Sequence, residues 1–147
     1  MSIVRFIMPG VPRGKARPRA RIVGGHAHIY TPSVTASEEG AVRLFTSQAM
    51  RGRPPMDGPI DLRLAAYMPV PPSWSEKKRK SALAGRIMPT GRPDVDNIAK
   101  LVMDGMKGIA WRDDTQVVNF AAWKRYSDEP RIVVEARGMT DAGSVAA

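Results

Sequence analysis

The sequence predicts a single small domain of the α+β (mixed α/β) class. In this domain, helices pack on one mixed β-sheet. The chain has 147 residues, of which 43% are hydrophobic, enough for one core but not for two independent ones. Segments with the two-residue period of strands interleave with segments with the period of helices, which favours this architecture. Cysteine is absent, so neither a disulfide framework nor a thiolate metal site is possible.

The amino-terminal half predicts a strand, a hairpin and a helix. Residues 3–8 form an apolar run that Pro9-Gly10 ends. Gly24-Gly25 predicts a hairpin between residues 20–23 and 26–30.

A helix should then start at Thr31-Pro32, or at a capping box that runs from Thr35 to Glu38. Its expected apolar stripe is Ala41, Leu44, Phe45 and Ala49. Residues 51–58 are rich in proline and glycine and close the helix as a loop.

The carboxy-terminal half begins with the alternating strand pattern of residues 60–66. A capping box from Ser73 to Glu76 predicts a short basic helix. A second helix should begin near Asp96 or Asn97, with Asp96 as its N-cap, and bury a stripe of four apolar residues, Ile98, Leu101, Val102 and Met106.

Two terminal strands are predicted at residues 116–125 and 131–136, joined by a turn at residues 127–130. The composition divides the chain into a domain at residues 1–137 and a small, polar tail at residues 138–147, which is expected to be disordered.

Charge is distributed unevenly along the chain. Lysine and arginine total 23 against 14 acids, a net charge of +9, and this balance indicates a nucleic-acid or other anionic partner. Residues 11–21 contain five basic residues and no acid, so contact with phosphate is favoured over a merely solvated face. The predicted DNA-binding residues are Arg13, Lys15, Arg17, Arg19 and Arg21.

An acidic cluster interrupts this basic chain at residues 94–114. Asp94 and Asp96 stand two positions apart, so both carboxylates can point toward one ion on an extended approach to the helix. Asp114 would complete a set of hard oxygen ligands that favours Mg²⁺, with Mn²⁺ as a possible substitute. Such an ion would activate a water and neutralise charge on phosphate, while Lys100 would stabilise the phosphoryl oxygens.

Each acidic pair also has an ordinary structural interpretation. An Asp-x-Asp pair before a helix often serves only as an N-cap, and Asp113-Asp114 could be a simple turn. Their joint occurrence within 21 residues of a basic chain shifts the balance toward function.

Three runs stand out in the chain: RPDVDNIAKLVMDG at residues 92–105, WRDDTQV at residues 111–117 and the basic segment PGVPRGKARPR at residues 9–19. The first two closely resemble the signature of the RusA family of Holliday junction resolvases, and the third is similar to the basic amino-terminal motif of that family. The similarity extends over residues 3–136, with no departure at the key positions.

The resemblance implies a Mg²⁺-dependent homodimeric endonuclease that binds four-way DNA junctions and nicks two strands symmetrically, in recombination and repair. It implies that Asp94, Asp96 and Asp114 are metal-binding catalytic acids and that Lys100 is the catalytic lysine. A cytoplasmic location, in a bacterium or encoded by a phage, and no membrane association are expected. Two alternatives stay open: a related metal nuclease that acts on flaps, forks or other branched DNA, and a non-catalytic basic DNA-binding module.

Overall fold

The computed structural model describes residues 2–15, 19–30 and 33–140. Its main sheet has four strands in the order β1-β6-β4-β5. The strands are β1 (Ile3–Pro9), β4 (Ile60–Met68), β5 (Val117–Tyr126) and β6 (Arg131–Gly138). β5 runs parallel to β4, and the other two neighbouring pairs are antiparallel, so the sheet is mixed as predicted.

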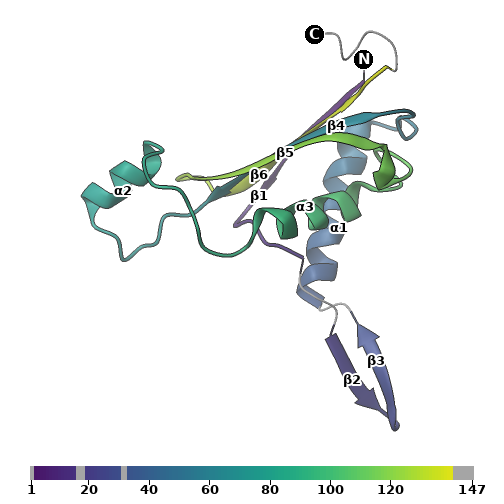
Figure 1. The fold of residues 1–147 in the computed structure, drawn as a ribbon, viewed down its shortest axis with the longest axis horizontal. Helices are drawn as coiled ribbons and strands as arrows, with labels where there is room; N and C mark the ends of the chain where they lie inside the picture. Colours follow the sequence, from purple (N-terminus) through teal and green to yellow (C-terminus); the bar gives the residue numbers. More distant parts are fainter. Residues whose placement is uncertain (1, 16–18, 31–32, 141–147) are drawn as a thin grey trace.

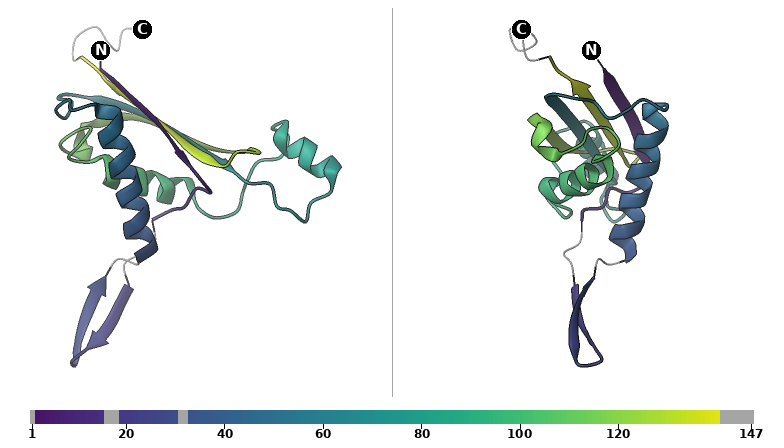
Figure 2. Two further views of the ribbon diagram at one scale, coloured as in Figure 1. Left: turned by 180° about the vertical axis from the view of Figure 1, so that it is seen from behind. Right: turned by 90° about the vertical axis from the view of Figure 1, so that its right-hand side faces the viewer.

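Two helices, α1 (Ser33–Met50) and α3 (Val95–Met106), cover one face of this sheet (Figures 1 and 2). The inward strand residues alternate as the sequence predicts; in β1, for example, Val4, Phe6 and Met8 are buried and their neighbours are exposed. The predicted stripe of α3 is confirmed, because all four of its residues have no exposed surface: Ile98, Leu101, Val102 and Met106.

The α1–α3 contact is unusually close at Gly105. A Cβ built on this glycine would lie 2.4 Å from Cγ1 of Val42 and 3.3 Å from the backbone oxygen of Glu39, so any larger residue would push the helices apart. Three of the four residues predicted for the α1 stripe, Ala41, Phe45 and Ala49, are partly buried and pack against the core. Leu44 is 57% exposed, and the fully buried positions of the helix are Val42, Thr46 and Met50. Thr46 is tolerated inside because its hydroxyl donates to the carbonyl oxygen of Val42 at 2.6 Å.

The predicted hairpin forms β2 (Arg19–Val23) and β3 (His26–Tyr30), which pair with each other and project away from the main sheet (Figure 1). α1 begins at Ser33, so the capping box from Thr35 is not its start, and the alternative start at Thr31-Pro32 lies outside the described residues.

Two further predictions about local structure are wrong. The short basic helix α2 (Glu76–Leu83) is capped by Ser75, whose hydroxyl accepts from the backbone N–H of Lys78, and not by Ser73. β5 and β6 do not pair as a hairpin, because β4 lies between them. The turn at residues 127–130 instead carries the chain across β4, which satisfies both of its neighbours with ladder hydrogen bonds.

At the carboxy terminus, β6 extends through Gly138, and the backbone N–H of Met139 donates to the carbonyl oxygen of Pro59 at 2.8 Å. Residues 141–147 lie outside the described residues, so the predicted tail stays a prediction. None of the helices in the described ranges is long and apolar enough to cross a bilayer.

Candidate active site

The amino terminus of α3 presents two exposed carboxylates. Asp94, and not Asp96 as predicted, is the N-cap: its backbone is extended and its carbonyl oxygen accepts the first helical hydrogen bond, from Ile98 at 3.1 Å. The Asp94 side chain makes no capping hydrogen bond, so its carboxylate is left available to a ligand. Asp96 follows in the first turn, where the helix dipole favours a negative charge.

Lys100 lies beside Asp96, as the helical spacing predicts. Its Nζ is 3.8 Å from Oδ2 of Asp96, and the side chains are 65% and 71% exposed. An ion pair this exposed contributes little to stability. The pair leaves a cation next to the Asp96 carboxylate at the surface, two residues after the exposed Asp94, an arrangement that suits a site where phosphate and a metal ion meet.

Lys124 of β5 holds the loop that leads into α3. Its Nζ donates to the carbonyl oxygens of Gly91 at 2.7 Å and Pro93 at 3.1 Å. The sequence alone did not indicate this residue, because only the fold shows that Lys124 is in register with the buried Ala66, on the helix-covered side of the sheet, where an ammonium group needs acceptors. Lys124 therefore fixes the position of the loop that leads to Asp94.

The basic amino-terminal segment docks on the first turn of α3. The backbone N–H of Lys15 donates to the carbonyl oxygen of Asn97 at 3.1 Å. A Cβ on Gly14 would lie 2.8 Å from Cβ of Asn97 and 3.1 Å from Cβ of Pro93, so only glycine allows this approach. The predicted basic and acidic motifs thus touch each other.

Lys15 and Arg13 are paired with acids, against the expectation that no acid lies near them. Lys15 Nζ donates to Asp104 and is 3.6 Å from Glu39, while Arg13 is 4.0 Å from Glu38. The hydrogen bond to Asp104, helped by its charge and by that of Glu39, raises the pKa of Lys15 above the usual 10.5 despite partial burial. The pairing of these acids with the basic segment was not predicted, because they come from α1 and from the far part of α3, which only the fold brings near.

The remaining predicted DNA contacts lie on or before the hairpin. Arg17 and the side chain of Arg19 fall outside the described residues. Arg21 is exposed on β2 and pairs across the hairpin with His28.

The second acidic pair has two separate roles. Asp113 caps the short 3-10 helix η1 (Asp114–Gln116), and the backbone N–H of Thr115 donates to its carboxylate, which lowers the pKa of Asp113. Asp114 is half-buried, and its Oδ1 accepts from Nε1 of the fully buried Trp111 at 2.8 Å. The buried Trp111 therefore fixes the orientation of the Asp114 carboxylate through the hydrogen bond from its indole.

Gln116 ties this acidic loop to the neighbouring loop at residues 56–58. Its Oε1 accepts from the backbone N–H groups of Arg112 and Asp113, and its Nε2 donates to the carbonyl oxygens of Met56 and Gly58, all at 2.8–3.0 Å. One amide side chain thus connects four backbone groups. Gln116 lies in the family-like run at residues 111–117, but the spacing of that run in the sequence predicted no role for it.

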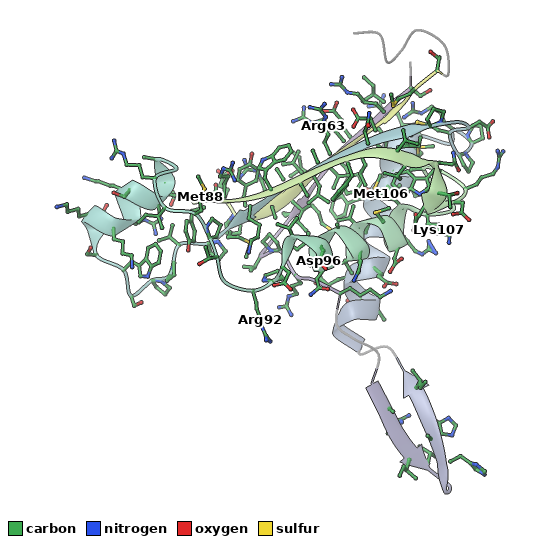
Figure 3. All side chains as sticks on the ribbon, viewed as in Figure 1. Arg63, Met88, Arg92, Asp96, Met106 and Lys107 are labelled. Atoms are coloured by element: carbon green, nitrogen blue, oxygen red, sulfur yellow. The ribbon has the colours of Figure 1, made fainter. Side chains whose placement is uncertain are left out.

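The two acidic groups lie at opposite ends of α3. Asp94 and Asp96 are at its amino terminus, whereas Trp111, which holds Asp114, bridges Lys107 directly after the last helical residue. Figure 3 shows Asp96 and Lys107 near the two ends of the helix. Twelve residues of α-helix rise about 18 Å.

Within the described ranges, no three histidine, aspartate or glutamate side chains gather closely enough to hold an ion. Lys100 contacts Asp96, but the described residues do not gather Asp94, Asp96 and Asp114 into one three-carboxylate group. The Mg²⁺ site at these three acids stays a prediction.

Comparison with known proteins agrees with the sequence motifs. The family model described as "Endodeoxyribonuclease RusA" matches residues 9–137. The chain is also 36% identical over 139 residues to YqaN, an uncharacterized protein of Bacillus subtilis (strain 168), a match that spans 93% of this chain and 97% of that protein. The matched region contains the docked basic segment, the amino terminus of α3 and the Asp114 loop, and the chain belongs to the RusA endodeoxyribonuclease family.

Proposed function

We propose that this protein is a structure-selective endonuclease that resolves four-way DNA junctions by paired symmetric nicks. Family membership gives the reaction class, and the observation that carries the proposal is the exposed group of Asp94, Asp96 and Lys100 at the tip of α3. The net charge of +9 supports a polyanionic substrate.

The residues have distinct roles in this proposal. Asp94 and Asp96 offer hard oxygen ligands at a surface that a phosphodiester can reach, and the cofactor is Mg²⁺, with Mn²⁺ as a substitute. Lys100 places its ammonium group against the phosphoryl oxygens as their charge develops. Lys124 holds the loop that leads to Asp94, and Gly14 allows the basic segment to pack closely against that loop and the start of α3.

DNA contacts are assigned to Arg13, Lys15, Arg17, Arg19 and Arg21. Lys15 and Arg13 are already paired with acids, so phosphate would compete with those carboxylates for both side chains. A two-stranded ribbon such as β2-β3 has a width that the major groove accepts.

Asp96→Asn tests the proposal. The variant should bind a four-way junction at least as tightly as the wild type, because it removes a negative charge near phosphate, while its cleavage rate falls by a factor of about 10³ or more. Binding is measured by fluorescence anisotropy without metal and cleavage on end-labelled junctions with Mg²⁺.

The matched control is Glu129→Gln, which removes a carboxylate charge from an exposed turn. Full cleavage by Asp96→Asn would rule out the proposed site. Tight binding with no cleavage by the wild type would leave a DNA-binding module, and faster cleavage of flaps or forks than of junctions would move the assignment to the branched-DNA nucleases.

A further inference from the structure

One face of the main sheet carries no helix in the part of the chain that the structure describes. α1 and α3 pack on the opposite face, and α2 stands beyond the end of the strands (Figures 1 and 2). In Figure 3, Arg63 of β4 lies across the sheet from Asp96 of α3. A sheet face of this kind meets solvent or a partner, and its side chains indicate which of the two.

The strand register builds an apolar row across the middle of this uncovered face. Ile7 of β1 is paired with Val133 of β6, Val133 with Ala65 of β4, and Ala65 with Trp123 of β5. Ala65 is the smallest of the four, and a hollow of about 380 Å³ opens beside it. Trp123 lines this hollow on the β5 side, and Val133 and Ile7 line it on the other.

The rows on both sides of the apolar row are rich in arginine. In strand order they are Arg5, Glu135, Arg63 and Ala121 on one side, and Pro9, Arg131, Tyr67 and Arg125 on the other. The acids of this face are Glu135, which pairs with Arg137, and Asp61, which lies 3.5 Å from Arg63. No acid of the same face balances the three remaining arginines, Arg5, Arg125 and Arg131, so the face is positively charged.

Arg131 is held in place before any ligand binds. Its guanidinium carbon lies 4.0 Å from the centre of the Tyr67 ring. Its Nη1 donates to the carbonyl oxygen of Glu129 at 2.7 Å and to Oγ of Ser127 at 3.2 Å. A side chain fixed in this way loses little conformational entropy on binding, and a planar guanidinium matches the geometry of phosphate.

An aromatic wall between two arginine rows suits an unpaired nucleic-acid strand. Bases of any kind stack on an accessible aromatic ring, and guanidinium groups bind the phosphates beside them. In a duplex the faces of the bases are already stacked on one another, so the ring of Trp123 would have no base to receive.

A second copy of the chain fits this face less well. A two-fold axis through the face would set its arginines against the same arginines of the copy. Such contacts between like charges oppose association.

We propose that the uncovered face of the main sheet binds an unpaired nucleic-acid strand, with a base in the hollow beside Trp123 and phosphates on the arginines of the two flanking rows. The site lies on the other side of the sheet from Asp96 and goes beyond the proposed function. It would hold a strand that the candidate active site does not cut.

Binding of a labelled oligothymidylate, measured by fluorescence anisotropy without metal, tests the site, because this strand does not pair with itself. Trp123→Leu keeps apolar bulk beside Ala65 and removes the aromatic ring. It should weaken binding by about fivefold or more, the lower end of what one stacked base contributes. The matched control is Trp74→Leu, which removes another half-buried tryptophan, in the loop before α2, and should leave the affinity unchanged.

Arg5→Gln gives a second readout that does not disturb the core, since Arg5 is exposed on β1. One phosphate contact of a single strand contributes about 0.7 to the slope of log K against log salt concentration, so the slope should become shallower by about that amount. Arg43→Gln makes the same charge change at an exposed position of α1, on the helix-covered side, and should keep the wild-type slope.

A wild type that does not bind oligothymidylate overturns the proposal, and so does wild-type binding by both Trp123→Leu and Arg5→Gln. Equal losses of affinity in Trp123→Leu and Trp74→Leu also overturn it. An equal loss of duplex affinity in Trp123→Leu rules out an unpaired strand as the ligand. If Trp123→Leu instead loses self-association in sedimentation and keeps oligothymidylate binding, the face belongs to a second copy. Because binding is measured without cleavage, a failure of the proposed function does not affect these results.

Discussion

Gln116 should hold the Asp114 loop through hydrogen bonds that no charged isostere can replace. In Gln116→Glu, the oxygen that replaces Nε2 would face the carbonyl oxygens of Met56 and Gly58, which now accept hydrogen bonds of 2.9 Å each. Two hydrogen bonds are lost at about 1 kcal/mol each, and the carboxylate adds repulsion, so the free energy of unfolding should fall by about 2–3 kcal/mol.

At 2–4 °C for each kcal/mol in a chain of this size, the melting temperature should drop by roughly 4–12 °C. The two carbonyl oxygens should raise the pKa of the introduced carboxyl in the folded state. Its destabilising effect is therefore present above the folded pKa and is relieved as pH falls through it, because the protonated carboxyl can donate to one carbonyl.

The assay is thermal unfolding at pH 7.5 and at pH 5, with Gln48→Glu as the control because it makes the same charge change at an exposed position of α1. Junction cleavage should fall with stability while junction binding is unchanged, because Asp114 moves and the basic surface does not. Identical melting curves for Gln116→Glu and Gln48→Glu at pH 7.5 would refute this account of the loop.

Two other substitutions test how the basic segment is docked. Gly14→Ala should lower the junction cleavage rate at least tenfold with little loss of helix signal, because its Cβ would meet Asn97 at 2.8 Å and push the segment off α3; near-normal cleavage would contradict this. Lys15→Met should destabilise the fold at neutral pH by leaving Asp104 unpaired. The folded pKa of Lys15 is raised above 10.5, so the greater unfolding free energy of the wild type is fully present below that pH and is lost as pH rises through the folded pKa. In denaturant unfolding, a difference between wild type and variant that is unchanged from pH 8 to pH 12 would contradict the ion pair.

Local periodicity predicted most of the elements, because strand alternation and the α3 stripe are properties of a few consecutive residues. The order of the sheet was not predictable in the same way. The turn at residues 127–130 suggested a hairpin, and the insertion of β4 between β5 and β6 depends on contacts far apart in the chain. The N-cap of α2 was predicted wrongly because Ser73 and Ser75 are both serines before Glu76, and only the structure shows that Ser75 has the extended backbone of the cap.

For the candidate site too, contacts within one helix were predictable from the sequence, and contacts between distant elements were not. The spacing of Asp96 and Lys100 on one helix predicted their contact, and that contact is present. The partners of Lys15 and the role of Lys124 were missed because they come from other elements of the fold. The separation of Asp114 from Asp94 could not be anticipated, since the loop after α3 sets it and its direction follows from the buried Trp111.

The most direct test of the central claim is cleavage of a synthetic four-way junction by the wild type, resolved to the nucleotide, with linear duplex and flap controls and with Mg²⁺ or chelator. The account predicts paired nicks at symmetric positions in two strands of like polarity, on the junction and only with the metal. Cleavage that persists in chelator, or that falls equally on linear duplex, would contradict it.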